Sequence, residues 1–99
     1  MGRPFSDPSL DYLIRGILTL RSEEECRSFL TDLCTESELQ EMSRRLQAAK
    51  MLKNNTIYVD IAEQTGLSTA TISRVNRCLK YGNGGYRVVL DRLSKEERH

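Results

Sequence analysis

The spacing of four residues between positions 58 and 77 restricts the fold more than any other feature of this sequence. Gly66 follows Ala62 by four positions, and Ile72 and Val75 lie six and nine positions after Gly66. That spacing is typical of a helix-turn-helix, in which a small residue lets two helices cross closely and a glycine takes the left-handed conformation that ends the first helix. The core predicted to fix the angle between the two helices consists of Ile61, Leu67, Ile72, Val75 and Leu79.

The rest of the chain repeats the apolar three-and-four spacing of helices, which predicts an all-α fold without strands. The Asn54-Asn55 pair and the GNGG run at 82–85 mark two helix ends. The expected helices cover about 8–20, 23–34, 36–53, 57–65, 69–80 and 86–94, and residues 95–99 are expected to fray. The expected N-cap residues are Asp7, Ser22, Thr35, Thr56 and Ser68, with Glu25 and Glu38 completing capping boxes at the second and third helices.

The length of the chain leaves room for one domain, residues 1–99, with 38 % hydrophobic and 29 % charged residues. Such a domain buries only about 60–65 % of the surface that its unfolded chain exposes, so the apolar stripes of the first two helices need a cover. We therefore expect a homodimer, with dimerisation helices at about 8–53 and 86–94 around a helix-turn-helix at about 57–80. The sequence contains neither a long apolar run nor a secretory leader, so we expect no membrane partner and a cytoplasmic location.

Cysteine and histidine usage argues against a disulfide framework, a metal site and a catalytic site. Cys26, Cys34 and Cys78 are odd in number, lack CxxC spacing and occupy apolar positions of helical patterns, which predicts reduced, buried thiols. His99 is the only histidine, so no cluster of metal ligands and no pair of nucleophile and histidine base can form. We expect no metal, no cofactor and no catalytic residue, and therefore no enzyme.

The charges are separated along the chain, although the net charge is only +1. Residues 1–41 hold four basic and nine acidic residues, a net of −5. Residues 68–92 hold five basic residues against Asp91 alone, a net of +4. This local excess coincides with the second helix of the predicted helix-turn-helix and favours an acidic partner such as a phosphate backbone.

The outward face of that second helix suits the major groove of double-stranded DNA. Its first turn carries short side chains that can approach base edges, and Arg77 and Lys80 can reach the flanking phosphates. A dimer would place two such helices on an inverted repeat, with half-sites about one helical turn apart. The candidate DNA-binding residues are Tyr58, Ser68, Thr69, Ala70, Thr71, Ser73, Arg74, Arg77 and Lys80.

Two other interpretations of the same residues stay open at this point. Gly-Leu-Ser at 66–68 is also an ordinary helix end followed by an N-cap, and a basic run is often a solvated face. The first two helices are amphipathic and acidic outside, which suits a helical protein-interaction module without specific DNA binding. Salt-dependent binding to duplex DNA distinguishes a DNA-binding regulator from such a module.

Two longer stretches carry a resemblance to a known family. STATISRVNRCLKYGNGGY, with DLCTESELQEMSRRLQAAKML upstream, resembles the Trp repressor superfamily and in particular its Trp-repressor-related YerC/YecD family. The similarity covers about residues 23–93, and its most specific element is ATISR at 70–74. The resemblance implies a six-helix fold, an intertwined homodimer, and bacterial regulation of transcription, as a repressor, through operator DNA in the nucleoid.

The resemblance also implies a candidate effector pocket. In the Trp repressor two arginines bracket the indole of bound tryptophan; Arg45 and Arg74 match them, and Thr35 matches a pocket threonine. Val75 stands where the Trp repressor has a glycine, and Cys78 where it has a serine that contacts the amino group of the ligand. Both changes remove what an amino acid ligand needs, so L-tryptophan is not expected as corepressor. Whether another small effector binds there stays open.

Overall fold

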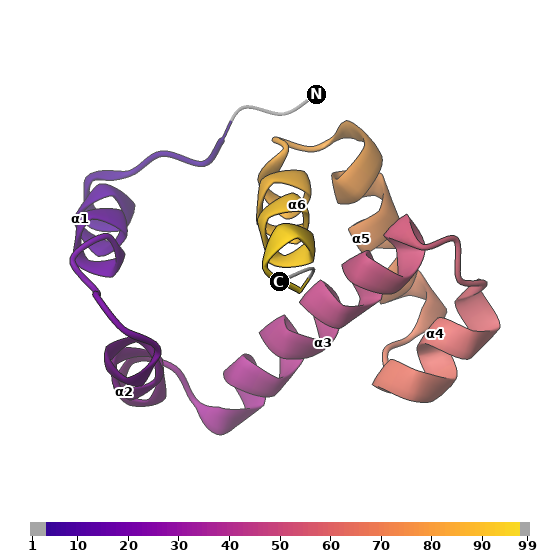
Figure 1. Cartoon of the computed structure of the whole chain (residues 1–99), viewed down its shortest axis with the longest axis horizontal. Helices are drawn as coiled ribbons and strands as arrows, with labels where there is room; N and C mark the ends of the chain where they lie inside the picture. The colour runs from indigo at the N-terminus through magenta and orange to yellow at the C-terminus, as the bar shows by residue number, and fades with distance from the viewer. Residues whose placement is uncertain (1–3, 98–99) are drawn as a thin grey trace. The chain divides into compact units, whose positions relative to one another are not determined.

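The computed structural model describes residues 4–97, which fold into six helices and contain no strand (Figure 1). The helices are α1 (Pro8–Ile17), α2 (Glu23–Leu33), α3 (Glu36–Lys53), α4 (Tyr58–Thr65), α5 (Thr69–Tyr81) and α6 (Gly85–Glu97). The all-α prediction with six helices is therefore confirmed. The described chain divides into two units, one ending at Gln40 and one beginning at Glu41.

Helix α1 of the first unit begins at Pro8 and ends earlier than its apolar stripe predicts. Asp7 has extended backbone at the N-cap position, but its side chain makes no capping hydrogen bond. The hydroxyl of Thr19 donates to the carbonyl of Gly16 at 2.6 Å, and the Thr19 N–H donates to the same oxygen at 3.1 Å. These bonds close a turn after Ile17, so the predicted end at Leu20 is wrong by three residues.

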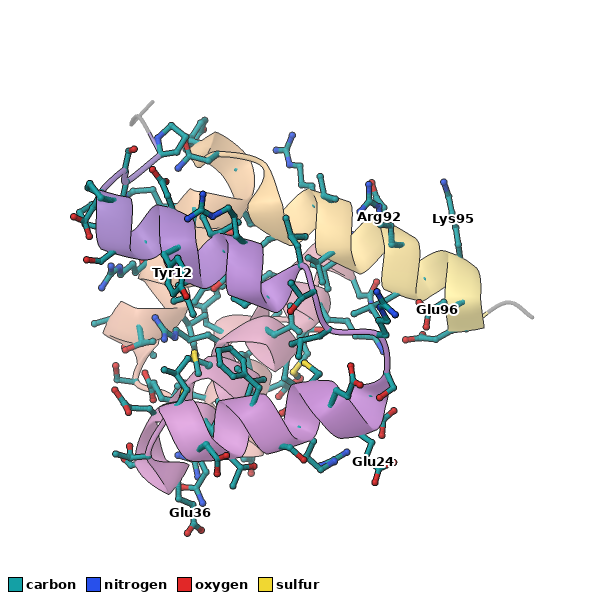
Figure 2. All side chains as sticks on the ribbon, turned by 90° about the vertical axis from the view of Figure 1, so that its left-hand side faces the viewer. Tyr12, Glu24, Glu36, Arg92, Lys95 and Glu96 are labelled. Atoms are coloured by element: carbon teal, nitrogen blue, oxygen red, sulfur yellow. The ribbon has the colours of Figure 1, made fainter. Side chains whose placement is uncertain are left out.

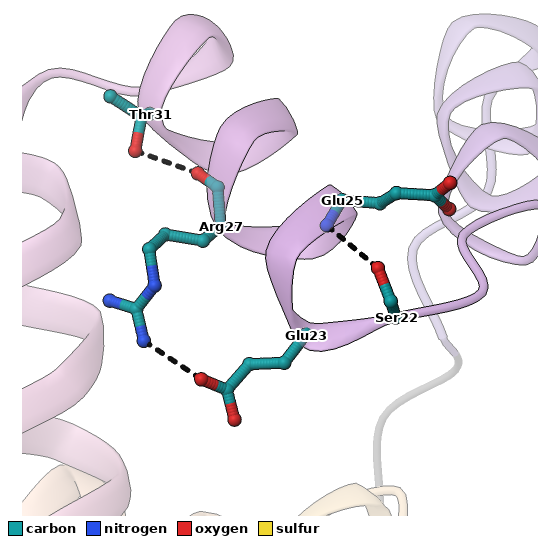
Figure 3. Close-up of polar contacts among 5 residues, drawn as sticks. All are labelled: Ser22, Glu23, Glu25, Arg27 and Thr31. Carbon is teal, nitrogen blue, oxygen red and sulfur yellow. Dashed lines mark hydrogen bonds and ion pairs between the residues drawn. The ribbon is translucent and has the colours of Figure 1, made fainter.

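Helix α2 is held by polar contacts within its own turns (Figure 3). The Ser22 hydroxyl accepts a hydrogen bond from the N–H of Glu25 at 3.0 Å, and the Glu25 carboxylate accepts from the N–H of Arg21 at 2.8 Å. Arg27 pairs with Glu23 one turn earlier at 3.2 Å. The predicted capping box therefore forms, with its second bond shifted to the residue before the cap. Cys34 is extended, so the helix ends one residue before its predicted end.

Helix α3 begins with a complete capping box. The Glu38 N–H donates to the Thr35 hydroxyl oxygen at 3.1 Å, and the Thr35 N–H donates to the Glu38 carboxylate at 2.8 Å. The backbone and side-chain hydrogen bonds from Thr35 hold the pKa of Glu38 below its ordinary value. Both bounds of this helix agree with the sequence prediction.

The second unit has its core where α3 contacts the three following helices. Ala48 of α3, fully buried, forms one cluster with Ile61, Leu67 and Ile72. Its neighbour Ala49 forms a second cluster with Val75 of α5 and Leu90 of α6. The predicted core of the helix-turn-helix is thus divided: Ile61, Leu67 and Ile72 fix α4 against α5. Val75, with half-buried Leu79 beside it, instead packs α5 against α3 and α6.

The remaining helices differ from the sequence prediction at four ends: α4 begins one residue later, α5 ends one residue later, and α6 begins one residue earlier and ends three residues later. The N–H of Thr56 donates to the carbonyl of Met51 at 2.9 Å, so Thr56 belongs to the turn that closes α3. Ile57 takes the N-cap position of α4 instead, without a side-chain cap, and α4 begins at Tyr58. At the other end, α6 continues to Glu97, whose carboxylate lies 3.4 Å from the Lys50 ammonium. Residues 95–97 are therefore helical, and residues 98–99 lie outside the described part of the chain.

Candidate functional site

The turn between α4 and α5 is built around one glycine and one buried threonine. Gly66 has φ +76°, and its N–H donates to the carbonyl of Ala62 at 2.9 Å. The buried Thr65 hydroxyl donates to Ile61 at 2.7 Å and accepts from the N–H of Leu67 at 3.2 Å. The left-handed glycine predicted from the spacing is confirmed, whereas the role of Thr65 was not predicted from the sequence. The direction in which α5 leaves the turn is thus set by one backbone hydrogen bond at Gly66 and by two hydrogen bonds of the Thr65 hydroxyl.

Two candidate DNA-binding residues are engaged in capping α5. The Ser68 hydroxyl accepts from the N–H of Thr71 at 3.1 Å and donates to the Thr71 hydroxyl at 3.0 Å. Ser68 is exposed and Thr71 is half-buried. These contacts fix the first turn of α5 and use part of the hydrogen-bonding capacity of both side chains.

The outer face of α5 is small at its start and basic farther on. Three short side chains, Thr69, Ala70 and Ser73, are exposed. Arg74, Arg77 and Lys80 are exposed as well, and α5 contains no acidic residue. Tyr58 differs from this group because it is half-buried and packs against the cluster around Ala48. Asn76 of α5 is also half-buried.

A hollow of about 150 Å³ lies beside α5, between α3 and the start of α6. It brings together Arg45, Arg74, Val75 and Cys78, four of the five residues of the candidate effector pocket. Thr35 lies in the other unit, where its hydroxyl caps α3. The hollow also contains three residues that were not assigned to it from the sequence: Glu41, Thr71 and Tyr86. Glu41 could have been found, because it precedes Arg45 by one helical turn and shares its face.

The walls of the hollow are charged and polar on one side and apolar at Val75. Burial raises the pKa of Tyr86, and the nearby Arg45 guanidinium opposes this rise. Val75 is only 2 % exposed because it packs into the cluster with Ala49 and Leu90, so its side chain lines the hollow without filling it. The prediction of buried thiols is wrong for Cys78, which is exposed, while Cys26 and Cys34 are half-buried. Cys78 is exposed because it lies on the side of α5 that faces the hollow.

The described residues form neither a cluster of metal ligands nor a membrane-spanning helix. No three His, Cys, Asp or Glu side chains within residues 4–97 come together as metal ligands. None of the helices formed by these residues is both long enough and apolar enough to cross a membrane.

Comparison with known proteins gives one consistent result. The sequence profile of the family described as Trp repressor protein matches residues 8–94. The chain is 50 % identical over 88 residues to the uncharacterized protein YerC of Bacillus subtilis, and the match covers 89 % of this chain and 85 % of that protein.

Two solved structures are similar in both sequence and fold. A TrpR-like protein from Eubacterium eligens has 48 % identity and a TM-score of 0.84, over 89 % of this chain and 91 % of that one. A protein of Staphylococcus aureus described as a candidate Trp repressor has 49 % identity and a TM-score of 0.84, over 90 % and 89 %. The chain therefore belongs to the Trp repressor family, whose members are helical regulators of the DNA-binding type and not enzymes.

Proposed function

We propose that this protein regulates bacterial transcription, as a repressor, by binding double-stranded operator DNA as a homodimer. The observation that carries the proposal is the outer face of α5. Its N-terminal part presents Thr69, Ala70 and Ser73 to solvent, and every charged side chain that it exposes farther on is a cation. Short side chains allow a helix to approach base edges in the major groove, and the following cations suit the flanking phosphates.

The rigidity of the α4–α5 turn supports the same proposal. Specific readout requires a helix whose direction is fixed before binding. The Thr65 hydroxyl, the Gly66 turn and the Ser68 cap fix the start of α5 through bonds of 2.7 to 3.2 Å. The direction of α5 is therefore set before DNA arrives.

The exposed apolar residues of α1 and α2 support a second copy of this chain as the partner. Neither helix contains a buried residue, and Tyr12, Leu18 and Leu33 are more than half exposed. A second copy that covers these faces would give two α5 helices related by a twofold axis, which suits an inverted repeat. We propose the bacterial cytoplasm, and the nucleoid when DNA is bound, as the location of this dimer.

Selection from a random duplex library with the purified protein tests the proposal. We expect enrichment of an inverted repeat whose half-sites are about 34–36 Å apart. Replacement of Thr69 and Ser73 together by alanine should relax the sequence preference and spare non-specific affinity. Replacement of Arg77 by glutamine should weaken binding to every sequence and reduce the salt slope by about one unit.

The same test distinguishes a DNA-binding regulator from the alternative, a protein-interaction module. Such a module would enrich no sequence and would bind duplex DNA with the weak affinity of any basic surface. Glu63→Gln on the exposed side of α4 serves as the control, because it removes a charge of the opposite sign from the helix-turn-helix. Its binding should be unchanged or slightly stronger.

A further inference from the structure

Arg87 of α6 is turned toward the C-terminal end of α5. Its Nε donates to the carbonyl of Leu79 at 2.9 Å, and its Nη2 donates to the carbonyl of Lys80 at 3.2 Å. In the sequence this arginine is one of the five basic residues of the local positive charge at 68–92. The structure shows that its guanidinium bonds instead to the backbone of α5.

These two bonds complete the end of α5. The last carbonyls of a helix have no partner within the helix, and a guanidinium with several donors in one plane can bridge two of them. The carbonyl of Cys78 accepts from the N–H of Gly82 at 2.9 Å. A side chain at Gly82 would place its Cβ only 2.4 Å from that carbonyl oxygen, so the chain turns tightly here. Three successive carbonyls at this end therefore have partners, and two of the bonds come from Arg87.

The same face of α6 is tied to α3 one turn farther on. Asp91 follows Arg87 by four residues, and its carboxylate lies 2.5 Å from the Lys53 ammonium. The Lys53 hydrogen bond and charge, with smaller effects from Lys95 and Arg87, hold the pKa of Asp91 below its ordinary value. Polar contacts thus join α6 to the end of α5 through Arg87 and to the end of α3 through Asp91.

We propose that Arg87 is a positioning residue for DNA recognition, which holds the end of α5 that carries Arg77 and Lys80 at a fixed place on α6. A charged donor makes stronger hydrogen bonds to carbonyls than a neutral one, and a cation at a helix C-terminus is favoured by the helix dipole. Because the Gly66 turn and the packing of Ile72 against Ile61 hold the start of α5 on α4, a second contact at its end fixes its direction as well as its position.

This inference rests on the proposed function and differs from two simpler roles for Arg87. As a phosphate contact, Arg87 would contribute equally to every DNA sequence and to the salt slope. As a purely structural residue, it would affect the stability of the protein and leave the preference among sequences unchanged. A positioning residue affects the preference among sequences in the folded protein.

The experiment compares R87Q, R87K and R92Q with the unmodified protein. Arg92 lies on the same helix and extends outward into solvent, so R92Q removes the same charge from α6 (Figure 2). R87K keeps the charge at the end of α5 but replaces the planar fork with one ammonium. Affinities for the selected duplex and for a scrambled duplex are measured at several salt concentrations. Amide hydrogen exchange over residues 78–85 is measured without DNA.

We expect R87Q to lower the ratio of selected to scrambled affinity about three- to tenfold, the equivalent of one lost hydrogen bond. The rate of amide exchange over residues 78–85 should rise by a similar factor in R87Q. For both the affinity ratio and the exchange rate, R87K should give values between those of R87Q and the unmodified protein. R92Q should give the same values as the unmodified protein. An unchanged ratio with R87Q, or an equal fall for both duplexes with a smaller salt slope, overturns the proposal. If the unmodified protein selects no sequence, the proposed function fails by itself. In that case, an amide exchange rate over residues 78–85 that is the same in R87Q and in the unmodified protein also shows that Arg87 does not hold the end of α5.

Discussion

At the scale of single residues, Val75 separates the hollow beside α5 from the core behind it. Its side chain is almost completely buried against Ala49 and Leu90, yet it also forms one wall of the hollow. A glycine, which the Trp repressor has at the matching position, would leave this wall open. The valine therefore closes the wall of the hollow that Arg45 and Arg74 also line, and it packs α5 against α3 and α6.

We predict that DNA binding by this protein does not require L-tryptophan. Titration calorimetry with millimolar L-tryptophan should give no heat of binding, and affinity for the selected duplex should be equal with and without it. Val75→Gly should destabilise the protein by about 1 kcal/mol for the helix propensity of glycine, and by more for the lost packing. A saturable gain in DNA affinity of the unmodified protein with tryptophan would contradict this prediction.

Gly66 could be predicted from the sequence because its requirement is local. Its φ of +76° is needed to end α4, and a Cβ there would meet no atom within 4 Å. The partners of Val75 could not be predicted in this way. They are chosen by the packing of α3 and α6, and the spacing along α5 does not specify which neighbour each apolar residue meets.

We predict that Gly66→Ala destabilises the protein by about 1–2 kcal/mol, the cost of the left-handed conformation for a residue with a Cβ. Gly85→Ala is the matched control, because Gly85 also has open space around it but no positive φ. That control should be neutral or slightly stabilising. Urea denaturation at neutral pH measures both, and equal effects of the two substitutions would show that backbone strain at Gly66 is absent.

At the scale of helices, the ends that carry their own polar signals were the most predictable. The Ser22, Thr35 and Ser68 caps all form as expected, because each bond joins residues three apart and needs no partner from elsewhere. The starts of α1 and α4 show the limit. Asp7 and Thr56 are suitable capping residues by type, but the Asp7 side chain makes no capping hydrogen bond. The backbone N–H of Thr56 bonds to Met51 in the turn that closes α3.

The capping box of α3 gives a prediction for acid stability. Hydrogen bonds from Thr35 lower the folded-state pKa of Glu38 below its ordinary value of 4.5. The ionised Glu38 carboxylate therefore stabilises the folded protein fully above the pKa that Glu38 has in the unfolded chain. This stabilisation is lost as the pH falls through the pKa of Glu38 in the folded protein. Glu38→Gln keeps a capping partner without a titrating group, so its stability should fall less than that of the unmodified protein between pH 7 and about pH 3.

Urea denaturation at several pH values measures this difference for α3. Glu41→Gln, three positions farther along the same helix and outside the capping box, serves as the control. It should follow the pH dependence of the unmodified protein more closely than Glu38→Gln does. Parallel pH profiles for Glu38→Gln and the unmodified protein would contradict the assigned cause.

At the scale of the whole molecule, the sequence predicted six helices and the family but not the partners of the first two helices. The second unit has buried clusters on α3, α4, α5 and α6, whereas α1 and α2 contain no buried residue. The amphipathic pattern of α1 and α2 shows which faces need a cover. It does not show whether the cover comes from the same chain or from another, because the periodicity is the same in both cases. The prediction of a single domain over residues 1–99 also stays a prediction.

We predict that the protein is a homodimer at micromolar concentration and that the apolar face of α1 contributes to the interface. Ile14 lies on this face and is 45 % exposed. Burial of one such side chain stabilises by up to about 1.5–3 kcal/mol, and a twofold interface contains each residue twice. Ile14→Gln should therefore weaken dimerisation by about 100-fold or more. Asp11→Gln, an exposed polar position on the same helix, should leave it unchanged. Sedimentation over a range of concentrations measures both variants, and a well-folded monomer of 11.4 kDa for the unmodified protein would reject the dimer.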